Sequence, residues 1–363
     1  MAGPCCGVDK LSNNNAGQMV MRLLRPFLSS LLVTALVLGC APRLMATGDP
    51  RYEPKFETLP KSEKMNVAMS DGARLPLRIW PAKDPHAIII GLHGMNDYSN
   101  AFDMPGQWFA NRGVTTLAYD QRGFGEAPGR GLWAGPARMA DDLNTVIALA
   151  RKKYPGLPVY VMGESMGGAV AMRAFTTPNP PKVDGLILAA PAVWGWRAMN
   201  AFYETVLWMS AHLLPSMTMT GSGLKIQASD NVEMLRALGR DPLVIKGTEI
   251  GTIYGLVELM DEAAAAAPRI NVPVLMMYGS HDQVVPALPV GDTLRDMQRN
   301  KVNVTPACYP DGYHILLRDL ERETVWKDVE SWMLTPEMPL PSGAQNLDPC
   351  PALSASPVQG ALN

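Results

Sequence analysis

One serine stands between two glycines directly after an apolar run. In "VYVMGESMGGAVAM", residues 159–172, Gly163, Ser165 and Gly167 form the pattern G-x-S-x-G. The pattern follows a predicted strand and opens a predicted helix. That setting is typical of a nucleophile elbow, a sharp turn that exposes a serine hydroxyl and needs small neighbours. A hydroxyl is a weak nucleophile at neutral pH, so Ser165 can act only if a base lies beside it.

The best candidate for that base is His314, one of five histidines in the chain. It lies in "DGYHILLRD", after the last predicted strand, and Asp282 lies in "YGSHDQVVP", after the preceding strand. Alone, Asp282 could cap a helix and His314 could be a packed core residue. Together, the three residues follow strand ends in the order Ser, Asp, His, which predicts a catalytic triad for acyl transfer.

Acyl transfer also needs hydrogen-bond donors for the oxyanion that forms. After the apolar run "AIIIG" the chain turns at His93 and Gly94, which leaves the backbone N–H of Met95 as a candidate donor. The N–H of Met166, next to the candidate nucleophile at a helix start, is the second. We expect His93 to organise this loop rather than to serve as a base.

The elements that must position these residues alternate between strands and helices. The runs "AIIIGLHG", "VTTLAYD", "PVYVMGE", "VDGLILAAP" and "VPVLMMYGS" are apolar on both faces, as parallel strands covered by helices require. A hairpin with the turn "DGA" precedes them, and residues 137–154 have helical periodicity. The sequence predicts a mostly parallel, doubly wound α/β sheet over residues 63–334, with ligands at the carboxyl ends of the strands.

A stretch rich in Trp and Met, at about residues 193–246, breaks the alternation after the sixth predicted strand. Its apolar residues recur at steps of three and four, so it could be a helix packed on the core. We favour a helical cap whose inner face contacts an acyl group, since Met and aromatic side chains fit irregular apolar ligands. The residues expected to line this acyl pocket are Trp194, Met199, Phe202, Val206 and Met209.

The amino-terminal 40 residues read as an export signal. Two arginines precede the apolar stretch 27–39, which is too short to span a membrane, and "VLGCA" resembles a lipobox whose Cys40 becomes lipid-modified. A plain signal peptide or an uncleaved anchor is the alternative. Residues 1–18 are atypical, so translation could begin at Met19 or Met21. Residues 41–62, polar and with several prolines, are expected to form a tether.

Composition narrows the possible partners. The chain has 32 Lys and Arg against 34 Asp and Glu, without a basic cluster, which argues against nucleic acid. Five cysteines without zinc-type spacing predict no metal site. Cys308 and Cys350 could pair in an oxidising compartment, although residues 335–363, rich in Pro, Ser and Gly, are expected to form a disordered tail.

With these residues in hand, the sequence resembles the monoacylglycerol lipase and lysophospholipase group of α/β-hydrolases, which is similar to the serine aminopeptidase S33 family. The likeness covers residues 63–333 and rests on "LHGMNDYSNAF", "AYDQRGFGEAPGR", "GESMGGAVA", "YGSHDQVVP", "YHILLRD" and the cap segment "SDNVEMLRALGRDPLV". It implies the α/β-hydrolase fold and an ester hydrolase for single-chain lipids, without a cofactor. It also implies attack by Ser165, proton transfer by His314 and orientation of the imidazole by Asp282.

Other functions stay open on the sequence. The same triad could serve an esterase for non-lipid substrates, an acyltransferase or a peptidase. A non-catalytic lipoprotein that binds lipid is a further alternative, against which the complete triad argues. If Cys40 is lipidated, we expect the protein at a membrane surface of the bacterial cell envelope, where lipid esters are at hand.

Overall fold

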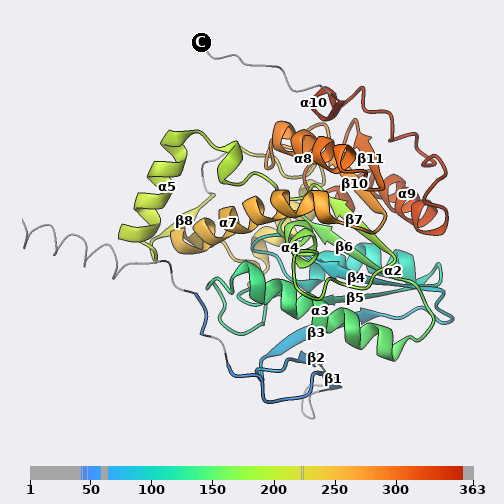
Figure 1. Ribbon diagram of the computed structural model, residues 1–363, viewed down its shortest axis with the longest axis horizontal. Helices are drawn as coiled ribbons and strands as arrows, with labels where there is room; N and C mark the ends of the chain where they lie inside the picture. The colour runs from blue at the N-terminus through green and yellow to red at the C-terminus, as the bar shows by residue number, and fades with distance from the viewer. Residues whose placement is uncertain are drawn as a thin grey trace, which may run out of the picture.

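A twisted sheet of nine strands forms the centre of the molecule (Figure 1). The computed structural model describes residues 42, 44–46, 48–58, 64–221, 223 and 225–354. The strand order is β1-β2-β3-β5-β4-β6-β7-β10-β11, and the pairs from β5 to β11 are all parallel. The strands are β1 (Lys55–Thr58), β2 (Met65–Ala68), β3 (Arg74–Trp80), β4 (Ala87–Leu92), β5 (Val114–Tyr119), β6 (Val159–Glu164), β7 (Gly185–Ala189), β10 (Val274–Gly279) and β11 (Val304–Tyr309).

Helices cover both faces of the sheet because its central strands are apolar on both sides. Every residue of β4, β5, β6, β7 and β10 is buried. One core lies between the sheet and the first group of helices, and a second core lies on the opposite face. The first group is α3 (Pro136–Lys153), α4 (Met166–Ala174), α7 (Ile250–Ala266) and α8 (Ala287–Arg299); the second is α2 (Asp103–Ala110) and α9 (Arg322–Leu334).

The predicted α/β fold is confirmed. Strands β2 and β3 form the expected antiparallel hairpin, with Gly72 at φ +83° in its turn. Helix α3 covers the predicted helical stretch and buries Met139, Leu143 and Ala150 on the side of the core. The apolar periodicity therefore identified both the strands and the covering helix.

The segment expected to be a tether takes part in the fold. Residues 55–58 form β1, which pairs antiparallel with β2 at the edge of the sheet, and Phe56 packs against the core. Further back, the N–H of Met45 donates to the carbonyl of Trp133 at 2.9 Å. The strand "KFET" has only four residues, which is too short for an alternation of apolar and polar residues to predict it from the sequence. The export signal and Cys40 lie outside the described residues.

The carboxyl-terminal segment also differs from the expected disordered tail. Residues 335–354 pack on the domain and end in the short helix α10 (Pro351–Ser354) against α8. Cys350 forms a disulfide with Cys308 in β11. Leu340 and Leu353 are buried, which gives this segment apolar contacts that its Pro-rich composition hides. Residues 355–363, the rest of the expected tail, lie outside the described residues.

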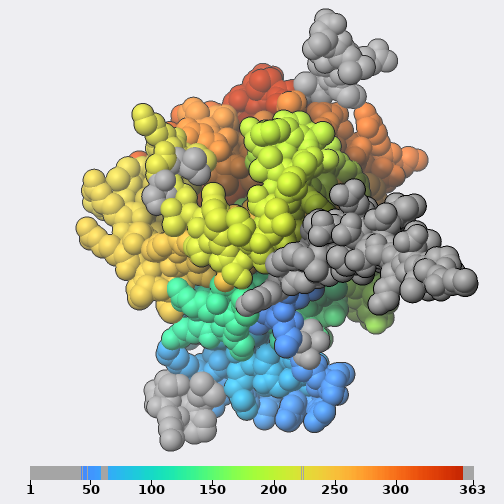
Figure 2. All heavy atoms as spheres, turned by 90° about the vertical axis from the view of Figure 1, so that its left-hand side faces the viewer, coloured from blue at the N-terminus to red at the C-terminus, as the bar shows by residue number. Residues whose placement is uncertain are grey.

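The predicted cap lies between β7 and α7. It contains α5 (Ala201–Leu213), β8 (Thr218–Thr220), α6 (Val232–Arg240) and β9 (Gly247–Glu249), and β8 pairs with β9. Helix α5 packs on α7, and its lime-green atoms stand at the surface of the face that Figure 2 shows. Because β1 was not expected, the strand before the cap is the seventh of the chain. Within the described residues, no helix is long and apolar enough to cross a membrane.

Candidate active site

Ser165 occupies a strained turn between β6 and α4. Its φ of 52° and ψ of −116° lie where an L-residue with a side chain rarely rests, which is how a nucleophile elbow exposes its hydroxyl. The Ser165 N–H donates to the carbonyl of Ala189 at 2.9 Å, and the Ser165 carbonyl accepts from Ala192 at 3.0 Å. These bonds fix the turn against the end of β7.

The glycines of the G-x-S-x-G pattern allow this turn to be tight. A Cβ on Gly167 would collide with the carbonyl oxygen of Leu92 at the end of β4, and one on Gly163 would collide with the backbone of Gly167. The first turn of α4 therefore lies directly against two neighbouring strand ends. This close packing explains why the pattern needs glycine on both sides of Ser165.

His314 and Asp282 are brought together by the loops after β11 and β10. The Nδ1 atom of His314 lies 2.8 Å from Oδ2 of Asp282, and both side chains are almost fully buried. The other carboxylate oxygen of Asp282 accepts from the N–H groups of Val284 and Val285 at 2.7 and 3.0 Å. A hydrogen bond donated by Nδ1 to this carboxylate would leave Nε2 as the ring nitrogen of neutral His314 that can accept a proton.

The loop after β4 lies against the serine. A Cβ on Gly94 would be 3.4 Å from Cβ of Ser165. His93 holds this loop: its Nδ1 donates to the carbonyl of Gly94 at 2.8 Å, and its Nε2 accepts from the N–H of Gln121 at 3.0 Å. Complete burial lowers the pKa of His93, so the ring is neutral. With both ring nitrogens occupied, His93 cannot serve as the base.

Two residues next to the contact of Gly94 with Ser165 have a backbone N–H without a partner among the described residues: Met95 follows Gly94, and Met166 follows Ser165. The N–H of Met95 has no hydrogen-bond acceptor within the part of the chain that the structure describes. Met166 is the first residue of α4, where an N–H has no acceptor inside its own helix. Both donors are thus available for a ligand oxygen.

Arg318 is a central residue that the sequence analysis missed. It lies in the short helical turn Leu316–Arg318, four positions after His314. Its Nη2 donates to Asp97 at 2.7 Å and to Glu164 at 2.9 Å, and all three side chains are almost fully buried. Burial acts to lower the pKa of Arg318, but the two carboxylates outweigh it and raise the pKa. The guanidinium therefore stays charged in the interior.

The cap holds an apolar cavity of about 380 Å³ beside α5. Three of the five expected acyl-pocket residues line it, namely Trp194, Met199 and Val206. Phe202 and Met209 do not: 70% and 48% of their surfaces are exposed. They lie seven positions apart and so share the outer face of α5, because α5 rests on α7 by its opposite side. The other lining residues are Tyr203, Leu207, Ser210, Met217, Met219, Ile250 and Ile253.

The apolar cavity lies near Ser165 along the chain. Trp194, which forms part of its wall, is two residues beyond Ala192, whose N–H donates to the Ser165 carbonyl. Two extended residues span about 7 Å at most. The wall of the cavity therefore begins close to the serine.

Comparison with known proteins shows the family. Residues 83–321 match the family model Hydrolase_4, described as "Serine aminopeptidase, S33". A monoacylglycerol lipase of Mycolicibacterium smegmatis is 25% identical over 73% of this chain and 94% of its own length. A human monoglyceride lipase is 24% identical over 78% of this chain and 94% of its own length.

Solved structures share the fold. A monoacylglycerol lipase of Paleococcus ferrophilus superposes with a TM-score of 0.60 at 19% identity, over 72% of this chain and 98% of the other. A soluble variant of the Saccharomyces cerevisiae monoglyceride lipase was solved with a substrate analogue. It superposes with a TM-score of 0.63 at 18% sequence identity, over 81% of this chain and 97% of the other. The expected α/β-hydrolase fold is confirmed, and the curated relatives support the prediction of a carboxylic ester hydrolase.

Proposed function

Because the chain belongs to the serine aminopeptidase S33 family of α/β-hydrolases, we propose that it cleaves carboxylic esters of single-chain lipids, such as monoacylglycerols or lysophospholipids. The observation that carries the proposal is the buried hydrogen bond between His314 and Asp282 at the sheet edge where Ser165 forms its elbow. The names of the relatives favour lipid esters. An apolar cavity in the cap, whose wall includes Trp194, supports an apolar acyl group as well.

In the proposed reaction, Oγ of Ser165 bonds to the ester carbonyl carbon while its proton passes to Nε2 of His314. The tetrahedral intermediate collapses, the bond from carbon to the alcohol oxygen breaks, and the alcohol leaves with the proton from His314. Water then attacks the acyl carbon on Ser165 and gives a proton to His314; the bond from carbon to Oγ breaks, His314 returns the proton to Oγ, and the fatty acid leaves. Asp282 keeps the imidazole in the required tautomer and stabilises its positive charge.

The oxyanion of each tetrahedral intermediate would accept hydrogen bonds from the N–H groups of Met95 and Met166. This proposal is supported by the chain positions: Met166 directly follows Ser165, and Met95 follows Gly94, which lies against Ser165. One such donor is typically worth about 3 kcal/mol of the barrier. The acyl chain would occupy the apolar cavity, where it would contact Trp194, Met199 and Val206.

We further propose that the chain is exported and anchored at the bacterial cell envelope through lipid on Cys40. The disulfide between Cys308 and Cys350 supports an oxidising compartment, where such bonds persist. Expression in a bacterium fed radiolabelled palmitate tests the anchor: wild-type protein should be labelled, and a Cys40→Ser variant should not. Equal labelling of both proteins would contradict the anchor.

Fatty-acid release from a monoacylglycerol tests the hydrolase. The protein used should run from residue 41 to the end, so that the disulfide is kept. Ser165→Ala should lower the rate by about four orders of magnitude or more, and His314→Ala should do the same. Folding is checked by circular dichroism. A His314→Ala variant that keeps most of the rate would mean that another group is the base, and folded wild-type protein without release would contradict a lipid ester substrate.

A further inference from the structure

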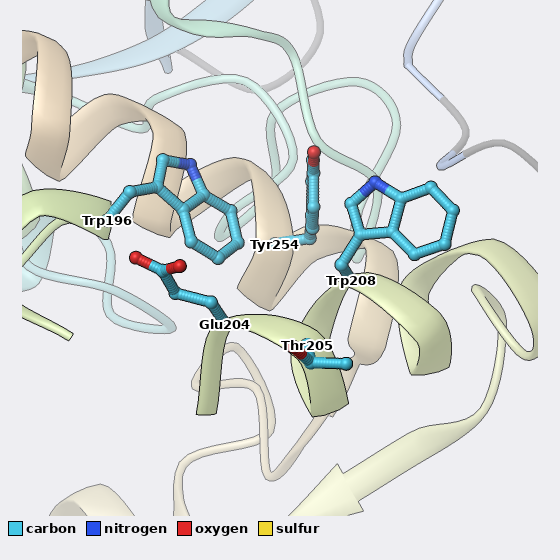
Figure 3. Close-up of a pocket in the computed structure, with 5 residues that line it drawn as sticks. All are labelled: Trp196, Glu204, Thr205, Trp208 and Tyr254. Carbon is cyan, nitrogen blue, oxygen red and sulfur yellow. The ribbon is translucent and has the colours of Figure 1, made fainter. Parts of the chain in front are cut away.

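A second cavity, of about 420 Å³, lies on the other side of α5 from the apolar cavity. Figure 3 shows its lining: two tryptophans, a tyrosine, a carboxylate and a hydroxyl. Trp208, Glu204 and Thr205 come from α5, Tyr254 comes from α7, and Trp196 comes from the segment before α5. We call it the aromatic cavity. It takes no part in the proposed cleavage, so its residues require another explanation.

The aromatic rings surround the space rather than fill it. Tyr254 stands between the two indoles in Figure 3, and its ring centre is 5.1 Å from that of Trp196. His212 stacks on Trp208 at 4.3 Å and meets the ring of Tyr254 edge-on at 5.6 Å. His212 is in turn held by its Nδ1 bond to the carbonyl of Trp208 at 2.7 Å. The rings are thus braced by one another in the absence of a ligand.

Among the five lining residues of the aromatic cavity, the charged one is the acidic Glu204. The carboxylate of Glu204 has no ion pair or hydrogen bond within the described residues, and it lies on the Trp196 side of the cavity in Figure 3. The nearby cation, Arg197, is paired with Asp261 at 3.4 Å. An anionic ligand would therefore be repelled, and a cation would be attracted.

Hydrogen-bond capacity limits which cation fits. The Thr205 hydroxyl donates to the carbonyl of Ala201 at 2.7 Å, and the lining offers one charged acceptor, Glu204, beside the Thr205 and Tyr254 hydroxyls. An ammonium or guanidinium group has several N–H donors and would have to keep part of its water shell beside these aromatic faces. A quaternary ammonium has no N–H donors, and its methyl groups contact aromatic faces favourably. From this geometry we propose that the aromatic cavity binds a trimethylammonium group, as found in choline and its esters.

The aromatic cavity is within reach of the reaction site. Trp196 is four residues beyond Ala192, whose N–H donates to the Ser165 carbonyl, so these two α-carbons are at most about 14 Å apart. A choline head group of a lysophospholipid could thus be held while its ester is cleaved. This part of the inference rests on the proposed function; binding of the cation itself does not.

Binding is tested without turnover, on full-length Ser165→Ala protein by titration calorimetry. Choline is the probe, and 3,3-dimethylbutan-1-ol, its uncharged carbon isostere, is the matched control. We expect choline to bind and the isostere to bind at least about fivefold more weakly, since the isostere lacks the cation–π attraction. Absence of choline binding, or equal binding of the two probes, would overturn the proposal.

Substitutions of lining residues test whether choline binds in this cavity. Trp208→Leu and Glu204→Gln should each weaken choline binding by about five- to thirtyfold. Phe202→Leu is the matched aromatic change on the same helix; its side chain lines neither cavity and is 70% exposed, so choline affinity should be unchanged. Equal losses from Trp208→Leu and Phe202→Leu would contradict the assignment.

The ligand could be the head group of a substrate or a free choline-like molecule. Enzyme kinetics on protein that keeps Ser165 distinguish these two sources. If the cavity holds a substrate head group, Trp208→Leu raises KM for lysophosphatidylcholine but not for the monoacylglycerol of the same chain length. If Trp208→Leu abolishes choline binding and leaves both KM values unchanged, the ligand is a free choline-like molecule. If the wild-type protein cleaves neither lipid, the proposed function fails while the calorimetric result still decides the cation site.

Discussion

Arg318 and Glu164 are bonded at 2.9 Å, so the segment that carries His314 is tied directly to the residue before Ser165. The same nitrogen of Arg318 reaches Asp97, in the loop that supplies Met95. One guanidinium therefore joins the base segment, the nucleophile turn and the oxyanion loop. Loss of the Arg318 cation would be strongly destabilising, because it would leave both carboxylates buried without an ion pair.

Replacing Arg318 by methionine should therefore affect both stability and catalysis. Arg318→Met leaves Asp97 and Glu164 buried without their cation, and we expect a loss of about 3–5 kcal/mol in unfolding free energy. Ester hydrolysis should also fall, measured at a temperature where the variant is still folded. Arg299→Met is the matched control, since its ion pair is exposed and worth less than about 1 kcal/mol. Equal effects of both changes would contradict the role of Arg318.

The position of α5 predicts which cap residues control acyl-chain preference. Val206→Asp places a carboxylate in the apolar cavity and should lower kcat/KM for a decanoyl ester about tenfold more than for an acetyl ester. Met209→Asp puts the same charge on the outer face of the same helix, so its ratio of the two rates should match that of the wild type. Chain-length profiles of the three proteins check this. A larger shift in Met209→Asp would place the acyl chain elsewhere.

Because of Asp319, the free energy of unfolding should fall as the pH rises from about 4 to 6. Burial raises the pKa of its carboxyl to about 6, against hydrogen bonds from Ser229 and the N–H of Tyr313 that act to lower the pKa. The folded state therefore binds the proton more tightly than the unfolded chain, whose pKa is near 4. The stability from this group is complete below about pH 4 and is lost as pH rises through 6.

The measurement is urea unfolding at several pH values for wild-type and Asp319→Asn proteins. The difference between their unfolding free energies should change between pH 4 and 6, by up to about 1.4 kcal/mol per pH unit. Asp142 has a pKa raised to about 6 by burial as well, so only the difference between the two proteins isolates Asp319. A difference that is constant over this range would contradict the predicted titration.

Reduction of the disulfide should loosen the carboxyl-terminal segment. The bond joins Cys308 to a residue 42 positions away, and such a link typically contributes about 2–4 kcal/mol. Wild-type protein should show a lower Tm in the presence of a reductant. Cys350→Ser should have that lower Tm with or without the reductant. A wild-type Tm that does not respond to reductant would show that the disulfide contributes little.

Local patterns in the sequence were enough to predict the central fold, and they gave the three residues of the candidate triad as a prediction. Ser165 and Asp282 each follow a strand that is recognisable from its apolar run, and His314 follows the less apolar β11. Arg318 was not predictable in this way, because its partners lie 221 and 154 positions away and only the folded chain brings them together. The available signal in the sequence was the charged side chain of Arg318 directly after the apolar residues of "HILL".

The errors in the cap and the tail have physical causes too. Phe202 and Met209 belong to an apolar stripe that is wider than the contact of α5 with α7, so part of the stripe faces outward. In the carboxyl-terminal segment, Leu340 and Leu353 are isolated apolar residues without periodicity, and a disulfide compensates for the small core. Neither effect can be read from the spacing of residues alone.

The carboxyl-terminal segment also protects the sheet from other chains. Strand β11 is the last in the strand order, so its outer edge could pair with a strand of another molecule. The N–H of Cys308 on that strand donates instead to the carbonyl of Ala344 at 2.7 Å. The disulfide from the same residue keeps the covering segment in place. A chain cut before residue 340 would thus expose a β-edge and be prone to aggregation, even if its site were complete.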